Sequence, residues 1–151
     1  MTTTEQYRAL APAVLDQAAD AVIFADVEGV IRSWNAAAAQ IFGFAAEEAI
    51  GRSLNLIIPE HLRQAHWSGF RRAMQSGATR LGGRPTMTRG LHQSGRRLYV
   101  EMSFAVVHAP WGTVAGSVSV ARDATARHEE ERARRQHTGA PPARAETSVK
   151  P

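Results

Sequence analysis

The stretch "PEHLRQAHWSGF", residues 59–70, holds the residue types best suited to binding a ligand. Proline is favoured in the first turn of a helix, so the pattern predicts a helix over 59–75 that Gly77 ends. On that helix His66 shares one stripe with apolar and small residues, whereas His61 lies off the stripe and faces solvent. An inward imidazole can pack, form a hydrogen bond, or bind an iron.

Gly69 lies three residues after His66 and removes side-chain bulk beside the imidazole. A flat macrocycle would need such room. An iron-binding imidazole would use Nε2 and leave Nδ1 for an orienting hydrogen bond. The same pattern also fits a hydrogen-bonded core histidine, and for His66 taken alone this second interpretation is favoured.

The elements that must position this helix follow from the apolar periodicity of the rest of the chain. Five strands are expected, and hairpin turns join the last three, which predicts an antiparallel sheet in an α+β fold. Short helices would pack on one face of the sheet, with flanking N- and C-terminal helices. In chain order the expected ranges are a helix at 5–19, strands at 21–25 and 30–34, short helices at 36–44 and 45–50, the helix at 59–75, and strands at 80–92, 98–107 and 113–122.

A length of 151 residues fits one domain with a substantial core. We expect a helical cap or dimerisation segment at 1–18, the main domain at 19–124 and an exposed exit helix at 125–137. The segment 138–151 is rich in proline, alanine and charge and is predicted to be a disordered tail.

The composition excludes several classes of function. The chain has no cysteine, which rules out disulfides, thiolate metal ligands and cysteine-based photochemistry. The sequence given shows no signal peptide and no run that could span a bilayer, so a soluble cytoplasmic protein without membrane contact is expected.

The positive charge leaves a nucleic-acid accessory role as a third and weaker hypothesis, and the polar residue types indicate no catalysis. The net charge of +4 is carried almost wholly by arginine, with acidic residues interspersed along the chain, so a nucleic-acid partner is not favoured. No zinc motif or nucleophile with a local base stands out, and we expect no enzymatic activity.

Several short motifs, in order and at consistent spacing, resemble a PAS domain over roughly residues 12–130. They are the opening hairpin ending in Trp34-Asn35, the helix AAAAQIFGF, the pair Gly51-Arg52, the turn Gln93-Ser94-Gly95 before LYVEMSF, and the exit sequence Arg122-Asp123-Ala-Thr. The resemblance implies a sensory and dimerisation module that holds haem, flavin, another chromophore, a small metabolite or nothing. Without cysteine, a flavin photoadduct is excluded.

The proline-led helix, with Arg63 three residues before His66, resembles the proximal helix of haem-binding PAS oxygen sensors. That resemblance implies heme b with His66 as the iron ligand. It also implies roles for further residues: Arg72 and Arg80 at the haem propionates, Leu81, Met102 and Phe104 on the apolar distal wall, and Arg84 and Thr86 where distal ligands sit. Arg72 and Arg80 fit ordinary surface arginines as well, and Arg84 fits a solvent-facing one.

Two functions are therefore expected as alternatives. The first is a sensor of oxygen, another diatomic gas or redox state, which relays the change through the exit helix to an unidentified signalling protein. Because Arg84 and Thr86 depart from the usual distal residues, this hypothesis leaves the gas open. The second is a cofactor-free or small-organic-ligand module for protein interaction and homodimerisation. It would pack Leu10, Val14 and Leu15 against a second copy.

Overall fold

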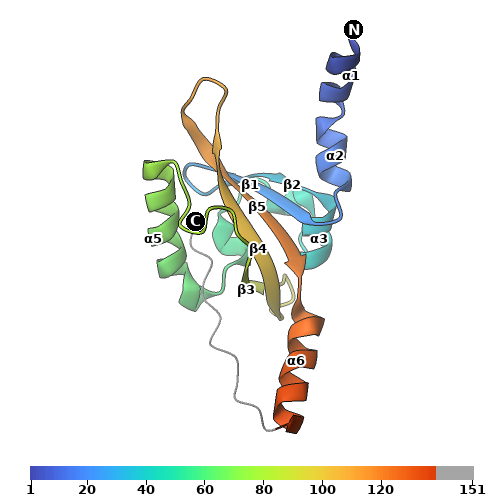
Figure 1. Ribbon diagram of the computed structural model, residues 1–151, viewed down its shortest axis with the longest axis vertical. Helices are drawn as coiled ribbons and strands as arrows, with labels where there is room; N and C mark the ends of the chain where they lie inside the picture. Colours follow the sequence, from blue (N-terminus) through green and yellow to red (C-terminus); the bar gives the residue numbers. More distant parts are fainter. Residues whose placement is uncertain (139–151) are drawn as a thin grey trace.

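The computed structural model describes residues 1–138 and contains one five-stranded antiparallel sheet with helices packed on one face (Figure 1). The strands lie in the order β2-β1-β5-β4-β3, and each neighbouring pair is antiparallel. This arrangement confirms the predicted α+β class. The strand bounds are β1 (Ala21–Asp26), β2 (Ile31–Trp34), β3 (Thr86–Leu91), β4 (Arg97–His108) and β5 (Val114–Asp123).

Six α-helices and two 3-10 turns are found in the described residues. The predicted helix 59–75 begins as a 3-10 turn before its α-helical part, and Gly77 ends it as expected, in the left-handed conformation at φ 74°. Of the predicted tail 138–151, all but Thr138 lies outside the described residues. The bounds are α1 (Thr3–Ala9), α2 (Ala11–Gln17), α3 (Ala36–Phe42), α4 (Ala46–Ala49), η1 (Leu54–Ile57), η2 (Glu60–Leu62), α5 (Arg63–Ser76) and α6 (Thr125–Thr138).

The buried side chain of Asn35 joins three elements at one end of the sheet. Its Oδ1 accepts hydrogen bonds from the amides of Val22 in β1 and Ala38 in α3, both at 3.0 Å. The second of these hydrogen bonds caps α3. Its Nδ2 donates to the carbonyls of Leu15 at 2.8 Å and Asp20 at 3.0 Å. One amide side chain therefore fixes the end of α2 against the main domain.

The large apolar residues of β4 face the helices, whereas those of β5 do not. Leu98, Val100, Met102 and Phe104 of β4 are all buried. In β5 the valines face outward, with Val120 38% exposed, and the buried residues are Gly116, Ser117, Ser119 and Ala121. Pairing decides this orientation, because Ser119 lies opposite Ile23 of β1 and Phe104 of β4, whose side chains both point to the core.

The predicted strand 80–92 was too long. Only Thr86–Leu91 pairs with β4, and the preceding residues form turns. Gly82 and Gly83 both have positive φ, which bends the chain before Pro85 and delays the strand. The shorter strand puts Thr86 opposite Met102 and Thr88 opposite Val100.

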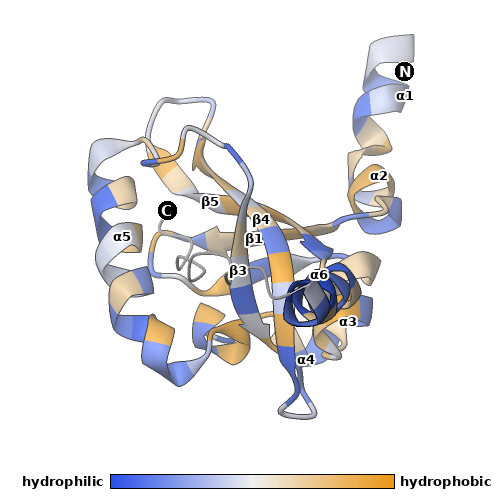
Figure 2. Ribbon diagram, turned by 60° about the horizontal axis from the view of Figure 1, so that its bottom comes forward, coloured by the Kyte–Doolittle hydropathy of each residue, from blue (hydrophilic) through white to orange (hydrophobic). Residues whose placement is uncertain are grey.

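Helices α1 and α2 project from one end of the sheet, and neither contains a buried residue (Figure 1). Leu10 is 50%, Val14 65% and Leu15 44% exposed. Figure 2 shows apolar colour on α2 where no other element covers it, while α6 is almost wholly hydrophilic. Among the described residues, no helix is long and apolar enough to cross a membrane.

Candidate functional site

Helix α5 presents the predicted stripe to the sheet, with His66, Gly69, Phe70 and Ala73 buried and His61 exposed. Polar contacts to the preceding segment hold the start of the helix. Arg63 Nε donates to the carbonyl of Ile58 at 3.0 Å, and its Nη2 donates to that of Asn55 at 3.2 Å. Trp67 Nε1 donates to Asn55 Oδ1 at 2.8 Å. Arg63 therefore fixes the backbone that aims His66 inward.

The imidazole of His66 lies among aromatic rings, and its Nδ1 has no polar partner in the described residues. Its ring centroid is 4.8 Å from that of Trp67, 6.0 Å from Phe70 and 6.4 Å from Phe104. The residue is 4% exposed, and Nδ1 is sealed from solvent with no hydrogen-bond partner in the described residues. Burial lowers the pKa of His66 to about 4, so the ring is neutral at pH 7. An unmet buried polar atom typically costs about 1–3 kcal/mol.

A small cavity lies beside His66, between the helices and the inner face of the sheet. The centre of a water-sized molecule can move within a volume of about 40 Å³ inside this cavity. Because one water needs roughly 10–15 Å³ on this measure, the space suits a molecule of a few heavy atoms. Its lining is mainly apolar: Phe42, Leu54, Ile57, Ile58, Leu62, His66, Thr88, Arg89, Gly90, Val100, Met102, Phe104 and Ser119.

The structure brings together three of the residues predicted for the site, since His66, Met102 and Phe104 line this cavity. Gly69 is buried one helical turn after His66 but is not part of the lining. The others also lie outside the lining: Arg72, Arg80 and Arg84 are exposed, and Leu81 and Thr86 are half-buried.

Two polar residues of the cavity wall, Thr88 and Ser119, were not predicted from the sequence. Thr88 lies two residues beyond Thr86 on the same face of β3, so strand periodicity could have found it once the strand was correctly bounded. Ser119 was hidden because the valines of β5 suggested the opposite face. Gly90 lies in a tight part of the wall, since a Cβ there would lie 3.1 Å from both Phe42 and Val100 and would press on these side chains.

The described geometry does not fit haem. Pockets that enclose drug-sized ligands start at about 300 Å³, far above the space beside His66. An iron-binding imidazole is normally oriented by a partner on its other nitrogen, and Nδ1 has none. Arg72 and Arg80 point to solvent from outside the cavity. Haem therefore stays a prediction from the sequence that this site does not favour.

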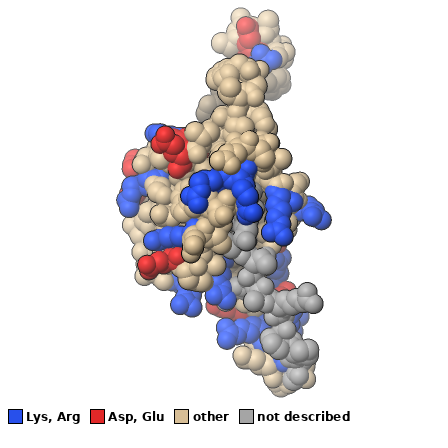
Figure 3. Space-filling view, turned by 90° about the vertical axis from the view of Figure 1, so that its left-hand side faces the viewer, with Lys and Arg blue, Asp and Glu red and all other residues tan. Residues whose placement is uncertain are grey.

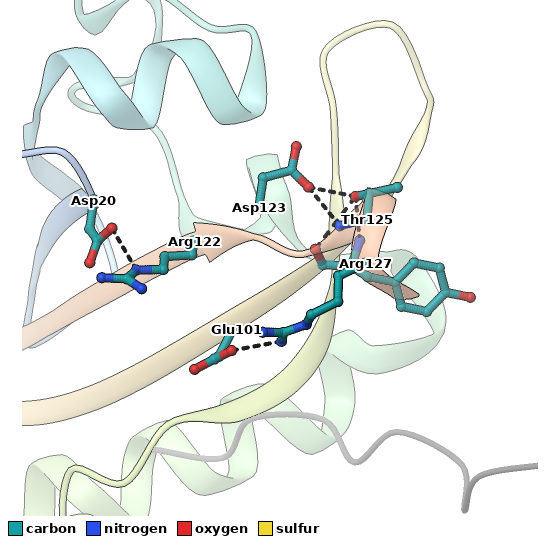
Figure 4. A network of polar contacts seen from close by, with 7 residues as sticks. Asp20, Glu101, Arg122, Asp123, Thr125 and Arg127 are labelled. Carbon is teal, nitrogen blue, oxygen red and sulfur yellow. Dashed lines mark hydrogen bonds and ion pairs between the residues drawn. The ribbon is translucent and has the colours of Figure 1, made fainter. Parts of the chain in front are cut away.

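The strand that lines the cavity also holds the exit helix on its other face (Figure 4). The amide of Tyr99 donates to Thr125 Oγ1 at 3.0 Å, and that hydroxyl donates to Asp123 Oδ1 at 2.6 Å. Arg127 of α6 pairs with Glu101 at 2.8 Å. Tyr99 also stacks on His128, with ring centroids 3.6 Å apart. The first turn of α6 is thus fixed to β4.

A second ion pair on the sheet connects the N-terminal end of β1 to β5. Arg122 Nε lies 2.9 Å from Asp20 Oδ1, as Figure 4 shows. Because Asn35 binds the carbonyl of the same Asp20, the segment that leads from α2 into β1 is held from both sides. The two flanking helical segments are therefore anchored to one sheet.

Comparison with known proteins gives a consistent family. The family model described as the PAS fold matches residues 9–124. An uncharacterized protein of Azorhizobium caulinodans is 37% identical over 92 residues, which is 60% of this chain and 12% of that protein. The chain thus spans about an eighth of the length of that relative.

Solved structures agree on the fold. A PAS domain from Colwellia psychrerythraea superposes with a TM-score of 0.68 at 23% identity, covering 82% of this chain and 98% of that one. An RNA-binding light-oxygen-voltage receptor gives 0.67 at 25% identity over 87% of this chain and 38% of that one. A PAS domain of a Burkholderia thailandensis transcriptional regulator, in complex with ethanol, gives 0.58 at 16% identity over 75% and 96%.

Proposed function

Because the chain belongs to the PAS family, whose members are sensory and signalling modules, we propose that it senses a small neutral molecule held beside His66. One observation carries the proposal. A buried histidine, neutral at pH 7 and without a partner for Nδ1 among residues 1–138, lines a cavity large enough for a few heavy atoms. A molecule that hydrogen-bonds to the imidazole would offset part of the cost of burying it.

The chemistry of the wall limits the ligand. Charged molecules are disfavoured because the lining is mainly apolar. Arg89 belongs to the lining, but its guanidinium lies over the ring of Tyr99 on the outer face of the sheet and so places no charge in the cavity. A compact molecule with one hydroxyl, carbonyl or amide group fits best, with its polar end toward His66, Thr88 or Ser119. The ethanol complex of the Burkholderia domain supports a ligand of this size class. We assign no catalytic activity to the site.

Strand β4 offers a route from the cavity to the exit helix. Val100 and Met102 line the cavity on its inner face, while Tyr99 and Glu101 hold α6 on its outer face. A ligand that displaces the inner side chains would shift the same strand that carries the outer contacts. The first turn of α6 would then change its position or its stability, and a downstream signalling partner would read that change.

Haem is the second candidate, favoured by the inward position of His66 beside Gly69 on α5. The absorption spectrum separates the two. For a small-molecule sensor, protein produced with haem supplied shows no Soret band, or a band that His66→Ala leaves unchanged. A stoichiometric band that shifts in His66→Ala would establish haem and remove the small-molecule proposal.

The proposal is tested by thermal unfolding in the presence of ethanol, 2-propanol, acetone and acetamide. At least one of these probes should raise the unfolding temperature of the native protein by more than it raises that of a reference protein that cannot bind the probe. The reference is Ser119→Ile, which fills the cavity with an aliphatic side chain suited to a strand. If no probe separates the two proteins, or if both respond equally, the cavity is not a binding site.

A further inference from the structure

Positive charge is concentrated in one part of the chain. Residues 61–100 contain eight arginines and no aspartate or glutamate, a net charge of +8. The whole chain has 18 basic and 14 acidic residues, so the rest carries 10 basic and 14 acidic ones, a net charge of −4. Acidic residues are therefore interspersed with arginines only outside this segment. Such asymmetry favours an anionic partner.

Most of these arginines are exposed to solvent. Arg63 donates a hydrogen bond to the backbone carbonyl of Ile58, and Arg89 lies over the ring of Tyr99. None of the remaining six forms an ion pair with an acidic side chain in the described residues. Figure 3 shows Lys and Arg gathered over the middle of the α5 side of the molecule, with acidic groups at its margin. The six are Arg71, Arg72, Arg80, Arg84, Arg96 and Arg97.

Four of them, Arg71, Arg72, Arg80 and Arg84, follow one another along the second half of α5 and the loop after it. We name these four the arginine surface. None of them lines the cavity beside His66, so they are not part of the ligand site. Planar guanidinium groups bind phosphate oxygens in pairs of hydrogen bonds, which makes arginine well suited to a phosphate backbone.

An exposed aromatic ring lies on the hairpin that meets the C-terminal end of α5. Trp111, at the tip of the hairpin between β4 and β5, is 79% exposed. The base of that hairpin meets the end of α5, since a Cβ on Gly77 would lie 3.2 Å from Nε2 of His108. Figure 1 shows the hairpin rising beside this end of the helix. Unstacked bases bind to such aromatic side chains.

We propose that the arginine surface and Trp111 bind single-stranded nucleic acid, with phosphates on the arginines and a base stacked on the indole. An anionic membrane is a poorer fit because the apolar stripe of α5 faces the core and leaves no apolar face to enter lipid. An unpaired strand fits better than a duplex because stacking on Trp111 requires a base outside a helix. This inference is independent of the ligand proposed for His66.

The test is fluorescence anisotropy of the full-length protein with labelled single-stranded RNA and DNA of about 12 nucleotides. Binding should weaken with salt, with a slope of log affinity against log salt near −0.7 per phosphate contacted. Changing the arginine surface to glutamine should reduce that slope by about 3 and abolish binding near physiological salt. Trp111→Ala should weaken binding by about fivefold or more.

The matched control removes the same charge elsewhere and should bind as the native protein does. It carries four exposed arginines changed to glutamine: Arg8, Arg52, Arg132 and Arg134. Circular dichroism checks that both variants are folded. Three results would overturn the proposal: no binding at about 50 mM salt, equal loss in both fourfold variants, or binding to anionic vesicles without binding to either oligonucleotide.

Discussion

His66 is the residue on which the proposed function depends, because it is buried without a partner for Nδ1. In the unfolded chain its pKa would be near 6.5, whereas in the folded protein it is about 4. Between these values the unfolded chain binds a proton that the folded protein does not. The free energy of unfolding is therefore unaffected by this titration above pH 6.5, and it decreases as the pH falls from 6.5 toward 4.

The substitution His66→Phe should remove both the unmet polar atom and the titration. At pH 7 the free energy of unfolding of the unliganded protein should rise by about 1–3 kcal/mol. Between pH 7 and pH 5 the native protein should lose roughly 2 kcal/mol relative to the variant. Urea unfolding at the two pH values measures this difference.

The exposed His61 provides the control at the residue scale. His61→Gln should leave the stability as it is in the native protein, because the side chain is exposed to solvent. Equal pH dependence in the native protein and in His66→Phe would contradict the account, since another group would then be responsible for the acid sensitivity.

At the scale of elements, strand β4 connects the cavity to α6 through alternate residues. Thr125 is the main polar contact in this connection: it accepts from Tyr99 and donates to Asp123. Thr125→Val should leave the Tyr99 amide without that partner and loosen the first turn of α6. Losing a buried partner costs about 1–3 kcal/mol, so amides of that turn should exchange with solvent about 5- to 100-fold faster.

Hydrogen exchange followed by mass spectrometry or NMR measures the effect on α6. Thr138→Val, at the other end of the same helix, is the matched control and should leave the first turn unchanged. If exchange in the first turn is the same in Thr125→Val as in the native protein, the helix is not held through β4.

The sequence predicts some elements better than others, for physical reasons that differ between strands. The clean alternation in β4 identified its buried face because large apolar residues occupy every second position. In β5 the valines line the outer face, and only pairing with β1 and β4 shows that Ser119 faces inward. Residues 80–85 were predicted to belong to a strand, but two glycines with positive φ turn the chain there.

The candidate site was predictable only in its centre. Helical periodicity places His66 inward, and the same rule puts His61 in solvent. The cavity walls come from elements far apart in the chain, so Thr88 and Ser119 could not be assigned without the register of the sheet. Arg72 and Arg80 were assigned by resemblance to haem-binding PAS sensors, and both are exposed in the structure.

At the scale of the whole molecule, α1 and α2 carry apolar residues that no other described part of the chain covers. If these residues pair with a second copy, the native protein should be a dimer and a triple variant, Leu10→Gln, Val14→Gln and Leu15→Gln, a monomer. Substitution is preferable to truncation because Asn35 donates to the carbonyl of Leu15. Light scattering after size exclusion measures the mass.

The control for this prediction changes polar residues of the same two helices, Gln6→Ala and Asp16→Ala, and should keep the native mass. A native protein that is already monomeric, or a triple variant that keeps the mass of a dimer, would contradict an interface through these helices.

The central claim is that a small neutral molecule beside His66 changes the exit helix. NMR of nitrogen-labelled protein titrated with ethanol tests it most directly, because the imidazole nitrogens and the backbone amides of α6 are observed together. We predict saturable shifts at His66 and in the first turn of α6, both lost in Ser119→Ile. Shifts that do not saturate, or that persist unchanged in Ser119→Ile, would contradict the claim.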